Sequence, residues 1–301
     1  MKLALIVGAQ GQDGQILKER LDADGSEVMT INRGDIALGD LAAVRCCIQR
    51  RPDEVYYLAA HHHSSQDRMD SDDIDLFHKS MEVHVEGLVS FLESIRQHSP
   101  QTRLFYAASS LIYGAAQTDT QDETTPLAPR CIYGITKTAG LHLCRFYREK
   151  HGIYASVGIL FNHESPLRQR KFVIPKIIEA AVAIANGSKS KLQLGDLSAR
   201  VDWGYAPDYV DAMTRILRLP YPDDFVVATG ETHSVQEVVE IIFGLLNLDW
   251  LEHVKETPEI LARKRSVLCG VSHKLRESTG WTPTISFQEM LKLLLEARCH
   301  E

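Results

Sequence analysis

The chain has 301 residues, of which 44% are hydrophobic and 24% are charged, so it can bury a large core and has an ordinary globular balance. Its net charge of -7 argues against a general nucleic-acid or anionic-membrane binder, because attraction to phosphate needs concentrated Lys and Arg. Six cysteines with no Cys-x-x-Cys pair do not indicate a disulfide scaffold. The apolar run at residues 3–7 soon meets glycines and Asp13, so it is neither a secretory signal nor a membrane span. We therefore expect a cytoplasmic protein.

The first half of the chain alternates short apolar runs with helix-length amphipathic segments. The runs expected to form buried strands are Leu3–Val7, Val28–Ile31, Val55–Leu58, Leu104–Ala107 and Ala155–Leu160. Strands that alternate with helices predict an α/β protein with a doubly wound parallel sheet, the Rossmann architecture. Pro52 and Pro100 fall where this alternation requires two of the helices to end.

After Leu160 the pattern loosens into a polar turn at residues 162–166, a helix over Val173–Asn186, a strand over Phe225–Ala228 and a helix over Val235–Leu246. The chain is therefore expected to cross more than once between a Rossmann domain and a smaller α/β substrate-binding domain. We assign residues 1–161 and about 200–232 to the first domain, and about 162–199 and 233–301 to the second.

Three glycines, Gly8, Gly11 and Gly14, follow the first expected strand and precede an amphipathic helix. This spacing lets the backbone approach a pyrophosphate at the positive end of a helix, which predicts a dinucleotide site. The second strand ends at Asn32-Arg33, where NAD-binding proteins usually carry a carboxylate for the ribose hydroxyls. Arginine in its place favours NADP, whereas Asp35 nearby leaves open that Arg33 is a solvated loop residue.

Tyr133 and Lys137 lie one turn apart on the helix expected over residues 131–150. A nearby ammonium stabilises phenolate, so Lys137 is expected to lower the pKa of Tyr133 toward the working range of a general acid or base. Ser109, at the end of the fourth strand, would hold a substrate oxygen, which completes a catalytic set of Ser109, Tyr133 and Lys137.

These residues carry a resemblance to the extended short-chain dehydrogenase/reductases, and most closely to their GDP-mannose 4,6-dehydratase branch. The similarity runs almost end to end. Besides the glycine turn and the dyad, it is carried by residues 39–41, 52–60, 123–126, 158–166, 202–204, 208–210 and 225–230. The run Asn162-His163-Glu164-Ser165-Pro166 is the most specific of these motifs.

The resemblance implies an NADP(H) site, a GDP-linked sugar as substrate and the residues that bind each. The cofactor would be bound by Gly8, Gln10, Gly11, Gln12, Asp13, Gly14, Arg33, Asp40, Leu41, Leu58, Ala59, Ala60, His61, His62, Lys137, His163 and Arg168. The sugar nucleotide would be bound by Ser110, Leu111, Asn162, Val173, Lys176 and Arg200.

One departure from the family pattern bears on the reaction. Dehydratases of this branch carry Thr-Ser-Glu where this chain has Ser109, Ser110 and Leu111. That glutamate supplies the base and the acid that eliminate water from a 4-keto sugar, and a cysteine has a proton-transfer role at this place in the similar GDP-fucose synthases. Leucine does neither. We therefore predict an enzyme that reduces the C4 ketone of a GDP-linked 4-keto-6-deoxy sugar with NADPH.

Other departures concern the nucleotide and the assembly. The family's Arg-Asp-Trp is Arg200-Val201-Asp202-Trp203 here, and its Arg-Pro-x-Glu is replaced at residues 263–266. The assignment of GDP as the nucleotide is therefore less secure than the assignment of the fold. The segment after the second strand is shorter than in the dehydratases, where it contributes to tetramer contacts. The resemblance implies a homodimer, or a tetramer, through the helix at about Ile74–His98 and the helix after Cys131.

Several alternatives remain open at the sequence level. His61-His62-His63 more plausibly covers the cofactor than binds a metal, because consecutive side chains diverge, although His63 would serve as a displaced base. The basic cluster at residues 168–176 either binds a diphosphate or forms the solvated start of a helix. Alternative functions are a GDP-mannose 4,6-dehydratase, a nucleotide-sugar C4 epimerase with tightly held cofactor, and a catalytically silent nucleotide-binding protein. No nucleic-acid, membrane or metal partner is expected.

Overall fold

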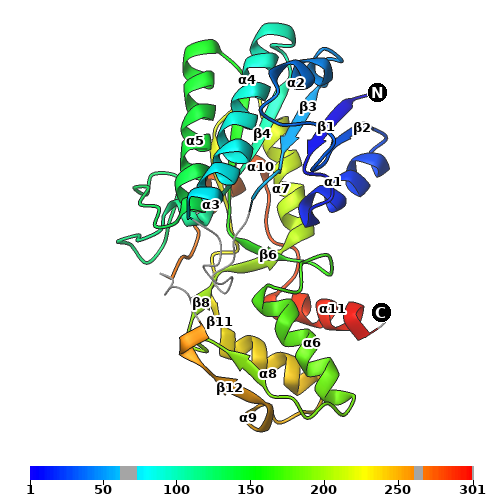
Figure 1. Cartoon of the computed structure of the whole chain (residues 1–301), viewed down its shortest axis with the longest axis vertical. Helices are drawn as coiled ribbons and strands as arrows, with labels where there is room; N and C mark the ends of the chain where they lie inside the picture. Colours follow the sequence, from blue (N-terminus) through cyan, green and yellow to red (C-terminus); the bar gives the residue numbers. More distant parts are fainter. Residues whose placement is uncertain (62–72, 261–266, 300–301) are drawn as a thin grey trace.

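A computed structural model describes residues 1–61, 73–260 and 267–299 (Figure 1). Its centre is a six-stranded, all-parallel sheet with the order β10-β5-β4-β3-β1-β2. The strands are β1 (Leu3–Val7), β2 (Glu27–Ile31), β3 (Glu54–Tyr57), β4 (Arg103–Ser109), β5 (Ala155–Leu160) and β10 (Asp224–Val227). Every residue of β3, β5 and β10 is buried, as expected for strands covered on both faces.

Helices cover both faces of this sheet. On one face lie α2 (Leu41–Ile48), α4 (Gly87–His98) and α5 (Ile132–His151), and on the other lie α1 (Gln12–Ala23), α7 (Ala206–Arg218) and α10 (His273–Thr279) (Figure 1). Local signals set their ends: Asp40 caps α2 by accepting from the amides of Ala42 and Ala43, and Gly152 closes α5 in the left-handed conformation. The predicted fold class is confirmed.

The helix expected at about Ile74–His98 is not one regular helix. It comprises α3 (Asp73–Met81), a π-helical turn η1 (Glu82–Glu86) and α4. A π-turn inserts one residue into the helical repeat, so the side chains on its two sides point in different directions from those of a continuous α-helix. Apolar periodicity does not indicate such a turn, because the pattern resumes on the far side.

A second, smaller unit lies below the carboxyl ends of the sheet in Figure 1. Its helices are α6 (Val173–Ala185), α8 (Val235–Leu245), α9 (Trp250–His253) and α11 (Phe287–Cys299). Its strands form two-stranded pairs: β6 (Asn162–Glu164) with β9 (Trp203–Tyr205), β7 (Leu192–Leu194) with β12 (Val254–Glu256), and β8 (Arg200–Val201) with β11 (His233–Ser234). Short 3-10 turns are η2 (Ser110–Ile112) and η3 (Pro258–Ile260).

Two separate hydrophobic clusters correspond to the sheet and to the smaller unit. The apolar faces of α6, α8 and α11 meet in the second cluster around Ile177, Val239 and Leu291. Residues from the C-terminal part return to the first: Trp281 is buried there and its indole N–H donates to the carbonyl of Asp208. The chain thus contributes to both units from more than one segment, and the domain bounds given above stay a prediction. No helix in the described ranges is both long and apolar enough to cross a membrane.

Candidate active site

A cavity of about 920 Å³ opens at the carboxyl ends of the parallel strands. Gly8 follows β1, Ala59 follows β3, Ser109 ends β4 and Phe161 follows β5, and all four line it. Ligands of open α/β sheets bind where the strand order reverses, and here β1 and β3 are neighbours whose connections leave in opposite directions. The parallel topology therefore brings together residues from distant parts of the chain.

The glycine turn after β1 has no space for side chains. A Cβ atom at Gly8 would lie 2.8 Å from the amide nitrogen of Ala59, and one at Gly14 would lie 2.5 Å from the carbonyl oxygen of Gly8. Gly8 also has a φ of 93°, a conformation that favours glycine. Because no side chain caps α1 at Gly11, the amides of its first turn are available to an anion. This cradle fits a dinucleotide pyrophosphate.

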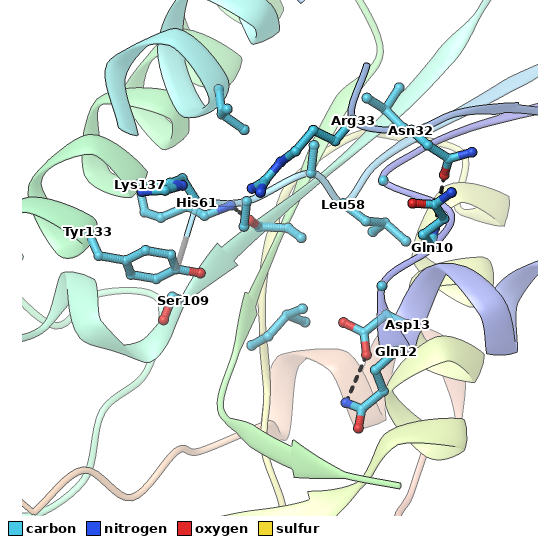
Figure 2. Close-up of a pocket in the computed structure, with 18 of the residues that line it drawn as sticks. Gln10, Gln12, Asp13, Asn32, Arg33, Leu58, His61, Ser109, Tyr133 and Lys137 are labelled. Carbon is cyan, nitrogen blue, oxygen red and sulfur yellow. Dashed lines mark hydrogen bonds between the residues drawn. The ribbon is translucent and has the colours of Figure 1, made fainter. Parts of the chain in front are cut away.

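The end of β2 forms the other wall of the cradle. The side-chain oxygen of Asn32 accepts from the amide of Gln10 at 3.0 Å, while the carboxylate of Asp35 accepts from the amide of Asn32 at 2.7 Å. Asp35 is therefore engaged in closing its own turn. Arg33 is exposed but lines the cavity, and Figure 2 shows its guanidinium extending into the space between the cradle and Tyr133.

A buried ion pair joins α1 to β6 beside the cradle. Both carboxylate oxygens of Asp13 lie 3.0 Å from Nε2 of His163, and Nδ1 of His163 lies 2.7 Å from the carbonyl oxygen of Phe161. Since both ring nitrogens face acceptors, His163 is the doubly protonated imidazolium. Burial disfavours the charged form of both groups, but the attraction and the hydrogen bonds between them are together stronger. The pKa of Asp13 is therefore lowered, and the pKa of His163 is raised.

The three predicted catalytic side chains, Ser109, Tyr133 and Lys137, line the same end of the cavity (Figure 2). Lys137 is fully buried and donates to the carbonyl oxygen of Ala107 at 2.7 Å, which fixes α5 against β4. The start of α5 packs closely on residue 111, because a Cβ atom at Gly134 would lie 2.6 Å from the carbonyl oxygen of Leu111. Tyr133 directly precedes Gly134 and therefore lies near Leu111, which also lines the cavity.

The electrostatics of the dyad differ from the sequence prediction. Burial raises the pKa of Tyr133 above its ordinary value, and the cation that opposes this rise is Arg168, not Lys137. Burial also lowers the pKa of Lys137 to about 7. The expected lowering of the pKa of Tyr133 is therefore not found in this structure, because burial of the phenol dominates and an ammonium with a pKa of about 7 is only half protonated at pH 7.

Comparisons with known proteins bear on this geometry. The model of the family described as GDP-mannose 4,6 dehydratase matches residues 33–294. The chain belongs to the GDP-mannose 4,6-dehydratase family. It is 35% identical to GDP-mannose 4,6 dehydratase 1 of Arabidopsis thaliana, over 98% of this chain and 89% of that protein, and 32% identical to GDP-mannose 4,6 dehydratase of Homo sapiens, over 98% and 91%.

Solved structures agree on the fold. RMD from Pseudomonas aeruginosa complexed with NADPH has a TM-score of 0.86 at 19% identity and covers 100% of both chains. UDP-glucose 4-epimerase of Thermus thermophilus in complex with NAD has a TM-score of 0.83 at 23% identity and covers 98% of both chains. These neighbours show that the chain shares their fold over nearly its whole length.

The residues assigned to the sugar nucleotide by the family resemblance lie in different places. Leu111 and Asn162 line the cavity, whereas Ser110 is buried beneath it. Lys176 lies on α6 and donates to the carbonyl oxygen of Gln193 at 3.0 Å. Val173 begins α6, and Arg200 forms an ion pair with Glu237 at 3.0 Å; neither lines the cavity. Their contacts with a sugar nucleotide stay predictions.

Most residues assigned to the cofactor line the cavity. Those that line it are Gly8, Gln10, Gly11, Gln12, Asp13, Arg33, Leu58, Ala59, Ala60, His61, Lys137, His163 and Arg168. Gly14, Asp40 and Leu41 do not line the cavity. Gly14 packs against the backbone of Gly8 and Ala9, and Asp40 and Leu41 lie at the start of α2, after the lining residues Ala37 and Leu38. His62, His63 and the replaced motif at residues 263–266 lie outside the described residues.

The sequence did not indicate several side chains that shape this site. Lys79 and Glu82 line the cavity from α3 and η1, and Phe172 also lines it, with its ring centroid 3.7 Å from the guanidinium carbon of the predicted Arg168. His84 lies fully buried behind Tyr133. Helical periodicity marks such positions only as core or surface, so no sequence signal distinguished them from packing residues.

Proposed function

We propose that this member of the family reduces the C4 ketone of a GDP-linked 4-keto-6-deoxy sugar with NADPH, in nucleotide-sugar biosynthesis. The observation that carries the proposal is Leu111, which lines the cavity beside Tyr133 and Ser109. An aliphatic side chain there can neither accept nor donate a proton, whereas Ser109, Tyr133 and Lys137, which line the same cavity, are the groups that we propose for carbonyl reduction.

The cavity fits NADP(H) as the cofactor. The glycine cradle would take the pyrophosphate, and Arg33 would take the 2'-phosphate, which a guanidinium pairs with and a carboxylate would repel. The structural neighbour RMD, which is complexed with NADPH, agrees with this choice. Lys137 would hold the nicotinamide ribose, as the family resemblance implies. When bound, the reduced nicotinamide supplies the hydride that reduces the carbonyl carbon.

The protein's own groups supply the rest of the reduction. The Oγ of Ser109 accepts from the amide of Leu111 at 3.3 Å, which leaves its hydroxyl hydrogen free to donate to the substrate carbonyl. Tyr133, whose pKa is raised, stays protonated at neutral pH and donates its proton to the oxygen as that oxygen gains negative charge. The carbonyl thus gains one hydride and one proton and becomes an alcohol.

A second candidate is a GDP-mannose 4,6-dehydratase that uses a displaced base. Family membership and the names of the curated relatives favour it. Such an enzyme must remove the C5 proton of the sugar with a group other than residue 111, and His63 is the candidate that the sequence offered.

The partner would be a GDP-linked sugar, and the assembly a homodimer through α3, α4 and α5. Phe77 on α3, and Ile135 and Phe146 on α5, are large apolar side chains that are 40%, 48% and 46% exposed. Apolar groups gathered on adjacent helices mark an interface more often than a solvated face.

A panel of GDP-, UDP-, dTDP- and CDP-linked 4-keto sugars would test the proposal, with NADPH oxidation as the readout and Tyr133→Phe as the inactive control. We expect turnover with a GDP-linked 4-keto-6-deoxy sugar and a loss of at least about 100-fold in Tyr133→Phe. Formation of GDP-4-keto-6-deoxymannose from GDP-mannose would instead establish the dehydratase. No turnover with any of the sugars would revive the catalytically silent alternative, whereas full activity of Tyr133→Phe would show that Tyr133 is not the proton donor.

A further inference from the structure

The π-turn η1 is anchored where it faces the sheet. The hydroxyl of Tyr57 donates to the carbonyl oxygen of Val83 at 2.6 Å, within the turn. Gly87 makes room for this bond, since a Cβ atom there would lie 2.3 Å from the Tyr57 hydroxyl oxygen. A π-turn disturbs the regular helical hydrogen bonds, and such turns are found mostly at functional sites. The side chain that this turn places inside the molecule is His84.

His84 is fully buried and contacts two elements that form the cavity wall. Its Nε2 lies 3.0 Å from the amide nitrogen of His61, in the loop after β3 that lines the cavity. Its Nδ1 lies 2.8 Å from the hydroxyl oxygen of Thr136 on α5, and its ring meets the ring of Tyr133 edge-on, at 5.1 Å between centroids and 87°. Figure 2 shows His61, Lys137 and Tyr133 together at this end of the cavity.

These contacts determine which nitrogen of His84 carries the proton. The amide of His61 can only donate, so Nε2 must accept and is unprotonated. Nδ1 then carries the hydrogen and donates to Thr136, whose own hydroxyl donates to the carbonyl oxygen of Ile132 at 3.0 Å or of Tyr133 at 3.2 Å. A chain of directed hydrogen bonds therefore runs from the loop after β3 through His84 and Thr136 to the backbone at Ile132 or Tyr133.

We propose that His84 is a positioning residue that fixes the phenol of Tyr133 relative to the loop after β3. It does not line the cavity, so it acts through Tyr133 and His61 and not on the substrate itself. Its Nε2 accepts from the amide of His61 in the loop after β3. Its Nδ1 donates to Thr136 on α5, and its ring packs against the ring of Tyr133. The role of His84 in catalysis rests on the proposed reduction, whereas its role in positioning the loop after β3 does not.

The two functions of the ring can be separated by substitution. His84→Gln places an amide oxygen near the position of Nε2 and loses the bond to Thr136 and the edge contact with Tyr133. His84→Asn places an amide nitrogen near the position of Nδ1 and loses the bond to His61. His142→Gln, at an exposed position on α5, is the matched control, and thermal unfolding confirms that each variant is folded.

We would measure the Kd for NADPH by fluorescence titration without sugar, and kcat with the ketone substrate. His84→Asn should raise the Kd by about tenfold and His84→Gln by less than about twofold, as expected when one buried hydrogen bond is lost or kept. His84→Gln should lower kcat by about tenfold with little change in Kd. Equal effects of the two variants on Kd, or no effect of either, would overturn the proposal.

Thr136→Val and Thr136→Ser extend the test in case substitutions at His84 prevent folding. Thr136→Val removes the acceptor for Nδ1 and should lower kcat by about five- to tenfold with the Kd for NADPH unchanged, whereas Thr136→Ser should restore kcat. An unchanged kcat in Thr136→Val would contradict the proposal. If the wild-type protein turns over no 4-keto sugar, the proposed reduction fails, and the NADPH titrations still decide whether His84 positions the loop.

Discussion

At the scale of single residues, position 111 separates the two candidate reactions. Residue 111 lines the same cavity as Tyr133, and in this chain it is leucine. Reduction of a ketone needs no base at this place, whereas elimination of water needs a group that removes a carbon-bound proton. The proposed chemistry therefore depends on whether an ionisable side chain is present at this one position of the proposed site.

Restoring a carboxylate at this position should restore proton exchange. We expect Leu111→Glu to incorporate solvent deuterium at C5 of a bound 4-keto sugar about 10- to 100-fold faster than Leu111→Gln, because only the carboxylate can act as a base. Mass spectrometry of the product formed in deuterated water measures the exchange. Comparable exchange in the wild-type protein would mean that another residue already supplies the base and that reduction alone is the wrong reaction.

At the scale of secondary-structure elements, the ion pair of Asp13 and His163 joins the first turn of α1 to β6. The pKa of Asp13 is lowered from 3.8 and that of His163 is raised from 6.5, so the pair is fully formed between these two ordinary values. Its contribution is lost as the pH falls through the lowered pKa of Asp13, and also as the pH rises through the raised pKa of His163.

A double-mutant cycle with Asp13→Asn and His163→Gln should measure this coupling. We expect a coupling free energy of about 1 to 3 kcal/mol in urea unfolding at pH 5.5, where both groups are charged. At pH 9 the coupling should be smaller, because the imidazolium loses its proton. A coupling that is the same at both pH values would show that the pair contributes to stability without its charges.

The π-turn gives a second prediction at this scale. Gly87→Ala should lower the free energy of unfolding by about 1 to 3 kcal/mol, because its Cβ would lie 2.3 Å from the Tyr57 hydroxyl oxygen and 2.8 Å from Cβ of Leu38. Tyr57→Phe removes the first clash, so the double variant should lose less stability than the sum of the two single variants. Urea unfolding measures all three.

Gly244→Ala is the control for this experiment, since a Cβ atom there meets nothing within 4 Å. That substitution in α8 should stabilise the protein slightly, by up to about 1 kcal/mol. Strict additivity of Gly87→Ala and Tyr57→Phe would show that the hydroxyl does not restrict residue 87.

At the scale of the whole molecule, the exposed apolar side chains on α3 and α5 bear on assembly. Phe146→Glu places a charge in the proposed interface and should convert a homodimer into a monomer, because an unpaired charge is costly to bury. Sedimentation velocity measures the change, and Leu251→Glu, at a 68% exposed position on α9, is the control. A dimer that persists in Phe146→Glu would place the interface elsewhere.

Local patterns in the sequence determined much of this protein. Leu3–Val7 and Ala155–Leu160 form strands with the predicted bounds, because short apolar runs that alternate with helix-length segments are typical of buried strands in a parallel sheet. The glycines after β1 required a tight turn, and the spacing of Tyr133 and Lys137 placed both on α5. Each of these features depends on residues close together in the chain, so periodicity and spacing were sufficient to predict it.

Contacts between distant segments were decided only by the tertiary structure. The burial of Tyr133 raises its pKa and the burial of Lys137 lowers the pKa of its ammonium, because desolvation depends on every segment packed around each group. The π-turn places His84 between the loop after β3 and α5, and no local pattern indicates that displacement. Sequence motifs name the groups that can react, whereas burial and packing from the whole chain set their charge and their position.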